Sequence, residues 1–251
     1  RRVKDPAIAE KLIPKDHGFG VQRVPLETHY FEAYNRDNVH LVDIGETPIV
    51  RVTPTGLATT DRDFDFDIIV YATGFDAITG AFDRIDIRGV AGERLAEKWK
   101  DGPSTFLGMM IHGFPNLLMP SGPQSASATT NFPRGIETGV NWCTNLLEYA
   151  RKHDIVRADP SLQAEQEWSA KVTKMYSAVL MRKAKSWFTG YNSNVPGHEH
   201  GRPRYLVYNG GAPKFVAEIN EVVAKGYAGI ELPRDVEAAN RHPTAGAARS
   251  A

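Results

Sequence analysis

The chain has 251 residues, of which 41% are hydrophobic, 10% are aromatic and 24% are charged. This composition is typical of a globular protein with a sizeable core, and it excludes a wholly disordered chain or a fibrous repeat. Lys plus Arg and Asp plus Glu both number 30, so we expect no net attraction to nucleic acid or to an anionic membrane. The sequence also shows no apolar run long enough to span a membrane.

The single cysteine, Cys143, excludes an intramolecular disulfide framework. We interpret it as a buried thiol on a helix rather than as a nucleophile. Because the sequence shows no secretory signal, it predicts a protein of the reducing cytoplasm. The chain opens with Arg1 and lacks an initial Met, and we expect a fragment or a processed piece.

Helical patterns occupy segments in which apolar residues recur every three or four positions. These segments are residues 5–12, 133–150, 161–184 and 215–225. Asp5 is a suitable cap for the first helix, and Gly226 is a suitable end for the last. The helix after Pro133 is predicted to bury one stripe, made of Ile136, Val140, Cys143, Leu147 and Ala150.

Runs of β-branched residues predict strands at residues 39–44, 49–53 and 67–72, with a small β region at 80–92 and a short strand at 117–119. The run at residues 67–72 is apolar on both faces. Such a run indicates a central strand in a covered, partly parallel sheet.

Two glycine-containing segments are candidates for ligand contact. Thr73 and Gly74 follow the predicted central strand, at the edge where open α/β sheets bind ligands. A simple tight turn is the alternative there, and composition alone favours it. Residues 122–131 form a loop of small residues before a helix, whose N-terminal amides attract anions. A flexible loop that ends in a helix cap explains this segment equally well.

Three further segments have weaker signals. Arg23 carries a permanent positive charge that could stabilise a developing anion, although a solvated surface arginine is the simpler interpretation. Trp187 lies in a Gly-rich loop and is either a lid over a planar ligand or a hydrophobic anchor. His198 and His200 lack a third metal ligand nearby, so we interpret them as part of a polar loop.

Taken together, several segments resemble the C-terminal part of the flavoprotein Baeyer–Villiger monooxygenases, the class B flavin monooxygenases. The resemblance runs in order from about residue 3 to residue 232, and its segments include DIIVYATGFDAITG, KWKDGPSTFLG, GFPNLLMPSGPQSAS and SWFTGYNSNVPG. The ATG element alone occurs in many flavoproteins. In combination with the downstream segments it is specific to this family.

This resemblance implies an FAD- and NADPH-dependent enzyme. Its flavin C4a-peroxide, formed from O2, attacks a ketone to give an ester or a lactone. The implied fold is α/β, namely the C-terminal portion of a two-dinucleotide-binding-domain (Rossmann-like) flavoprotein, with a central strand ending in ATG and several helices. Residues 1–67 would be the tail of the NADP-binding domain with a linker. Residues 68–232 would be the C-terminal part of the FAD-binding domain with substrate-pocket loops, and residues 233–251 a flexible tail.

The resemblance also implies roles for individual residues. Arg23 stands at the position of the family's active-site arginine, where it would stabilise the peroxyflavin anion and the oxyanion of the adduct. Gln22 stands where a lysine is common, which puts an NADPH contact in doubt. The implied cofactor-binding residues are Ala72, Thr73, Gly74, Asp76, Gly122, Pro123, Ser125, Asn131 and Trp187. No metal is implied.

The sequence departs from the family pattern because it contains no Gly-x-Gly-x-x-Gly fingerprint for FAD or NADP. We therefore expect the isolated chain to fold poorly, to hold FAD weakly and to be inactive. We expect the missing N-terminal part of the same polypeptide to be its partner. Two alternatives stay open, namely a related flavin N- or S-oxygenase and a non-catalytic binding domain. The sequence does not specify the ketone.

Overall fold

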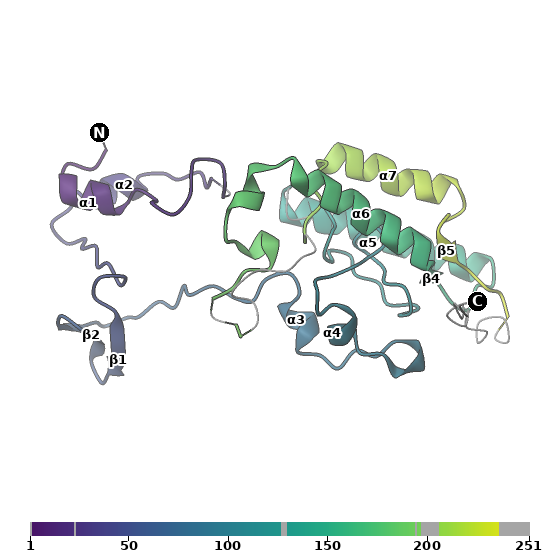
Figure 1. Ribbon diagram of the computed structural model, residues 1–251, viewed down its shortest axis with the longest axis horizontal. Coiled ribbons are helices and arrows are strands. Elements are labelled where there is room, and N and C mark those ends of the chain that lie inside the picture. The colour runs from purple at the N-terminus through teal and green to yellow at the C-terminus, as the bar shows by residue number, and fades with distance from the viewer. Residues whose placement is uncertain (1, 23, 127–129, 194, 197–205, 236–251) are drawn as a thin grey trace, which may run out of the picture. The chain divides into compact units, whose positions relative to one another are not determined.

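The computed structural model describes residues 2–22, 24–126, 130–193, 195–196 and 206–235. The chain divides into two compact units, Arg1–Phe75 and Asp76–Ala251 (Figure 1). This division lies a few residues beyond the domain boundary predicted after Asp67. In the part of the chain that the structure describes, every helix is too short or too polar to cross a membrane.

The first unit contains two short helices and one small sheet. Its elements are α1 (Pro6–Lys11), α2 (Tyr30–Ala33), β1 (Ile49–Thr53), β2 (Gly56–Thr59) and β3 (Asp63–Asp65). The sheet is antiparallel with the order β1-β2-β3, and Thr53 pairs with Gly56 across a tight hairpin. The predicted strand at residues 49–53 is confirmed. The predicted first helix is confirmed too, and the Asp5 carboxylate caps it by accepting from the Ala7 amide at 2.7 Å.

The predicted central strand at residues 67–72 is wrong in this structure. The segment forms no strand, and all of its residues except Ile69 are exposed, with Ile68 at 79% and Val70 at 81%. A strand needs a hydrogen-bonded neighbour as well as β-forming residues. Among the described residues no strand pairs with this segment. The predicted strand at residues 39–44 is also absent.

The second unit is mainly helical. Its elements are α3 (Gly80–Asp83), η1 (Val90–Gly92), α4 (Leu95–Lys98), α5 (Phe132–Lys152), β4 (Asp159–Pro160), α6 (Leu162–Ser177), η3 (Leu180–Lys183), η4 (Trp187–Thr189), α7 (Ala212–Ala224) and β5 (Ile230–Glu231). The strands β4 and β5 form a short antiparallel pair. The predicted β region at residues 80–92 is wrong, since α3 and η1 occupy its two ends and an isolated bridge from Arg88 to Arg94 is its β-type pairing. Residues 117–119 form no strand, although the Met119 amide donates to the Met109 carbonyl at 2.9 Å.

The long helices form where capping residues and periodicity predict them. The Asn131 side chain caps α5 by accepting from the Arg134 amide, and the Ser161 hydroxyl caps α6 by accepting from the Ala164 amide. The predicted helix at residues 161–184 ends earlier, at Ser177, and the short 3₁₀ turn η3 follows it.

The core of the second unit lies among α5, α6 and α7, the three long helices of Figure 1. Trp142 on α5 donates from Nε1 to the Ile219 carbonyl on α7 at 3.4 Å. Trp168 on α6 stacks on Tyr208, with ring centroids 5.4 Å apart. A second, smaller cluster gathers around the fully buried Trp99. Aromatic burial therefore holds the helices together.

The apolar stripe predicted for α5 is mostly wrong. The buried side of this helix carries Gly139, Trp142, Cys143 and Leu146. By contrast, the side chains of Ile136, Val140 and Leu147 are exposed. The apolar sector of this helix is therefore wide, and the described core covers only one part of it.

Candidate flavin and substrate site

The predicted site residues fall in separate parts of the molecule. Arg23 lies outside the described residues. Ala72, Thr73 and Gly74 belong to the first unit, where all three are exposed. Gly74 has a φ of +82°, and a Cβ placed on it would meet no atom within 4 Å. Backbone at this point is therefore open to close approach by a ligand.

The loop that carries Gly122, Pro123 and Ser125 is buried in the second unit. It packs tightly against a neighbouring turn. A Cβ on Gly122 would lie 2.6 Å from the Gly108 carbonyl oxygen, and a Cβ on Gly108 would lie 2.4 Å from the Ser125 nitrogen. Two glycines therefore let the backbones of the loop and the turn meet. This part of the predicted site is rigid core backbone.

Asn131 lies at the end of the same loop, as the cap of α5. Its side-chain oxygen accepts a hydrogen bond from the Arg134 amide at 3.3 Å. The first turn of α5 carries no acidic side chain. The positive end of a 21-residue helix therefore stands where the sequence predicts a contact with an anionic cofactor.

Trp187 and Asp76 are brought together. Both line one small crevice of about 10 Å³, together with Thr79 and Tyr191. The Trp187 ring is partly exposed and stacks on Phe188, with centroids 3.9 Å apart. Phe188 belongs to the same core cluster as Ala126 of the buried loop. The core thus supports both the Trp187 turn and the loop that follows Gly122.

Gln124 is a residue of this loop that the sequence does not mark as special. It is fully buried and has a φ of +65°. Its side-chain oxygen accepts from the Thr105 amide, the Thr105 hydroxyl and the Ser169 hydroxyl, and its side-chain nitrogen donates to the Pro103 carbonyl. These partners lie far away in the sequence, so local pattern carries no signal of them.

Two buried carboxylates form a second polar cluster that sequence reasoning missed. Glu165 accepts from the Ser104 hydroxyl at 2.8 Å and from the His112 amide at 2.6 Å, and it pairs with Lys98 at 3.1 Å. Asp159 accepts from the Gly113 amide at 2.9 Å and pairs with Arg157 at 3.1 Å. These bonds fix the turn at residues 112–113, which is a structural role.

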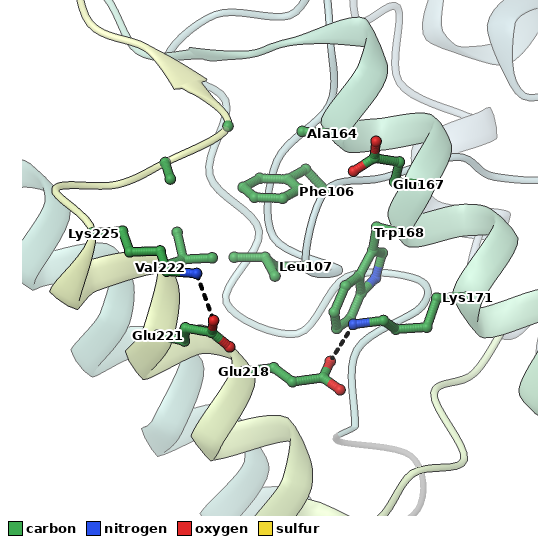
Figure 2. A pocket seen from close by; sticks show the side chains of 12 residues that line it. Phe106, Leu107, Ala164, Glu167, Trp168, Lys171, Glu218, Glu221, Val222 and Lys225 are labelled. Carbon is green, nitrogen blue, oxygen red and sulfur yellow. Dashed lines mark hydrogen bonds and ion pairs between the residues drawn. The ribbon is translucent and has the colours of Figure 1, made fainter.

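A cavity of about 350 Å³ lies between α6 and α7 (Figure 2). Phe106, Leu107 and Trp168 contribute apolar walls. Lys171 pairs across the two helices with Glu218 at 3.3 Å, and Lys225 pairs with Glu221 at 2.6 Å. None of the predicted site residues lines this cavity. The first pair connects α6 to α7, and the second lies within the last turn of α7.

Metal-binding groups do not gather in the described part of the chain. Within it, no three His, Cys, Asp or Glu side chains are placed to hold one ion. The segment with His198 and His200, which we interpreted as a polar loop, lies outside the described residues.

Known proteins match nearly the whole length of this chain in sequence. The chain is 44% identical over 234 residues to a 2-oxo-Δ3-4,5,5-trimethylcyclopentenylacetyl-CoA monooxygenase of Pseudomonas putida, and 41% identical over 233 residues to a cyclopentanone 1,2-monooxygenase of a Comamonas species. It is 37% identical over 234 residues to a phenazine N-monooxygenase of Lysobacter antibioticus. The first two matches cover 92% of this chain and the third 93%, but each covers only 42% of the relative. No family model matches.

Solved structures agree with these relatives. A crystal structure of OTEMO in complex with FAD and NADP superposes with a TM-score of 0.79 at 44% identity, covering 92% of this chain and 42% of that one. A closed structure of cyclohexanone monooxygenase gives a TM-score of 0.80 at 38% identity, with the same coverage. The similarity therefore lies in the arrangement of elements as well as in the sequence. Over nearly its whole length the chain is therefore similar to these monooxygenases, and it spans about 42% of their length.

Proposed function

We propose that this chain is part of an FAD- and NADPH-dependent monooxygenase that inserts one oxygen atom of O2 into a ketone, giving an ester or a lactone. The observation that carries the proposal is the 44% identity across 92% of the chain with the Pseudomonas putida monooxygenase. Because the chain spans about 42% of the length of that relative, the activity belongs to a larger polypeptide. The ketone itself stays open.

The described residues suit a flat, anionic cofactor at two places. The backbone at Gly74 has open space beside it, so a ring can lie against it. The start of α5, at Asn131, offers the positive end of a long helix to a negative ring or phosphate. FAD would supply the activation of O2, and NADPH would supply the electrons.

The residues of the chain would act by binding, orienting and charge stabilisation. Arg23 stays protonated at every working pH, so it would hold negative charge that develops on the substrate oxygen. Gly122, Pro123 and Ser125 would form a rigid wall beside the flavin ring and the substrate pocket. Trp187 would contact the nicotinamide end of NADPH, because its indole is partly exposed and rests on a buried support.

Further support comes from apolar side chains that the described residues leave uncovered. They include Ile68 and Val70 in the first unit, and Ile136, Val140 and Leu147 on α5. Relatives carry a further polypeptide segment that this chain does not match. We infer that this segment, the N-terminal part of the enzyme, covers these side chains and completes a Rossmann-like flavoprotein with two dinucleotide-binding domains.

We also propose the two domains that the family resemblance implies. Residues 1–67 belong to the NADP-binding domain and residues 68–232 to the FAD-binding domain. A cytoplasmic location is part of the proposal, and the absence of a second cysteine to pair with Cys143 is consistent with it.

The test uses one continuous polypeptide in which this chain replaces the matched part of the Pseudomonas putida relative. The purified protein should hold stoichiometric FAD, consume NADPH in the presence of a ketone and place one atom of isotope-labelled O2 in an ester. Arg23→Ala should abolish the ester while FAD stays bound. Arg36→Ala, at an exposed arginine of the same unit, is the matched control and should leave turnover intact.

The result that contradicts the proposal is equally specific. An FAD-loaded protein that oxidises NADPH, yet forms no ester from cyclic, aromatic or linear ketones, would exclude ketone oxygenation. The unsubstituted 251-residue chain, tested in parallel, should bind FAD weakly and form no ester.

A related N-oxygenase is a second candidate, favoured by the 37% identity to the phenazine N-monooxygenase. The same polypeptide distinguishes the two functions when it is supplied with a ketone and an aromatic amine in competition. Formation of N-oxide without ester would favour the second candidate. Loss of the ester alone on Arg23→Ala would favour the first.

A further inference from the structure

We propose that Gln124 is a positioning residue that fixes the wall of the substrate pocket. This inference rests on the proposed function, because that function places Gly122, Pro123 and Ser125 in the pocket wall. The family resemblance places the loop from Gln124 to Asn131 in this wall, but it gives the Gln124 side chain no role of its own. Its placement follows from hydrogen bonds to three separate parts of the second unit.

The side chain of Gln124 is held at both of its polar atoms. Its oxygen accepts from the Thr105 amide at 3.2 Å, the Thr105 hydroxyl at 3.0 Å and the Ser169 hydroxyl at 3.1 Å. Its nitrogen donates to the Pro103 carbonyl at 3.1 Å. A side chain one methylene shorter could not reach all of these partners from the same backbone position.

The backbone of Gln124 is held as well. Its amide donates to the Leu206 carbonyl at 2.7 Å, and its carbonyl accepts from the Trp168 indole at 3.3 Å. The φ of +65° lies in the left-handed region, which a residue with a long side chain rarely adopts. The surrounding hydrogen bonds therefore hold a backbone conformation that Gln124 alone would not favour.

These contacts connect the loop to helix α6 and to the chain on either side of Val207. The next residue, Ser125, extends the connection, because its carbonyl accepts from the Tyr208 amide at 3.1 Å. A displacement of Gln124 would therefore shift Gly122, Pro123 and Ser125 together. Since these residues form the proposed wall beside the flavin ring and the substrate pocket, the expected effect falls on the placement of the substrate against the flavin.

The test begins with the 251-residue chain itself and needs no activity. Gln124→Asn relieves the backbone, because Asn tolerates a positive φ, but it shortens the reach of the amide. Hydrogen exchange should then accelerate by about tenfold or more at the amides of residues 124–126, while α5 exchanges at its original rate. Gln166→Asn, at an exposed position on α6, is the matched control. It should change neither the exchange rate of residues 124–126 nor that of α5.

Kinetics in the continuous polypeptide provide the second readout. Gln124→Asn should raise the KM for the ketone by about tenfold and lower the yield of ester per NADPH, with FAD content and the KM for NADPH unchanged. Ser169→Ala removes one donor to the same amide oxygen and should give a smaller change in the same direction. It keeps the test informative if Gln124→Asn fails to fold.

Two outcomes would overturn the inference. One is an unchanged exchange rate at residues 124–126 in Gln124→Asn. The other is a folded Gln124→Asn or Ser169→Ala enzyme with the original ketone KM and coupling, which would leave Gln124 a core residue only. An inactive unsubstituted polypeptide would instead count against the proposed function. The exchange result would still decide whether Gln124 fixes the loop.

Discussion

A Cβ atom on Gly139 would lie 1.8 Å from the carbonyl oxygen of Pro120. Helix α5 therefore passes with bare backbone against the residue that precedes the buried loop. No side chain fits between them, and any substitution at this position must move either the helix or the loop. The position of the proposed pocket wall thus depends on a residue of α5 that is outside the predicted site.

The first prediction concerns this contact. Gly139→Ala should lower the free energy of unfolding by about 1–3 kcal/mol, because overpacking outweighs the better helix propensity of alanine. Urea unfolding followed by circular dichroism measures the change. Asn145→Ala, on the exposed side of the same helix, is the control and should be neutral or slightly stabilising. Equal stability of Gly139→Ala and the original chain would contradict the close approach.

A second prediction concerns the buried carboxylate of Glu165. Glu165→Ala should destabilise the second unit by about 3–5 kcal/mol, because it leaves Lys98 without its buried partner and the His112 amide without an acceptor. Glu167→Ala, two residues along on the exposed side of α6, should cost less than about 0.5 kcal/mol. Denaturant unfolding of the two variants compares them directly, and similar losses would refute a buried cluster.

A third prediction separates two adjacent aromatic residues. Phe188 is 3% exposed and packs in the core, whereas Trp187 is 36% exposed and rests on it. Phe188→Ala should therefore cost about 3–5 kcal/mol of stability. Trp187→Ala should cost far less in stability, and its effect should fall on NADPH binding in the continuous polypeptide. Thermal unfolding with NADPH titration distinguishes them, and a large stability loss from Trp187→Ala would show that it is an anchor.

The fourth prediction concerns alkaline pH. Burial raises the pKa of the Cys143 thiol from 9.0 to about 11. Between these values the unfolded chain releases the thiol proton while the folded chain keeps it, so the free energy of unfolding should fall as pH rises through this window. Cys143→Ala should reduce that slope. Part of it should remain, because burial also raises the pKa of Tyr208 and Tyr227.

Chemical unfolding at a series of pH values from about 8 to about 11 checks the fourth prediction. The comparison uses the slope rather than the absolute stability, since removal of the thiol also changes packing. A slope identical in the original chain and in Cys143→Ala would indicate that the thiol is not buried in solution.

The helices were predictable from sequence because their signals are local. The side chains of Asp5, Asn131 and Ser161 each cap a helix by accepting from an amide at most three residues ahead. One short stretch of sequence therefore specifies where the helix begins. The strand at residues 49–53 was predictable for a similar reason, since its partner follows directly after a tight turn.

Strand prediction failed where pairing is not local. The segment at residues 67–72 has the composition of a buried strand, but composition reports the preference of the backbone and not the presence of a neighbour. The site residues also differ in whether local sequence marks them. The small residues of the loop at 122–131 and the lone Trp187 stand out in the sequence. Gln124 does not, because its partners Thr105 and Ser169 become neighbours only through the fold.

The exposed segment at the end of the first unit has a practical consequence. Tyr71 and Phe75 are 73% and 85% exposed, and they lie in a described segment that forms neither helix nor strand. A protease that cleaves after aromatic residues should therefore cut here before it reaches the helical core. Brief digestion would release a fragment that begins close to Asp76, and mass spectrometry would identify it. Such a fragment offers a direct way to study the helical unit on its own.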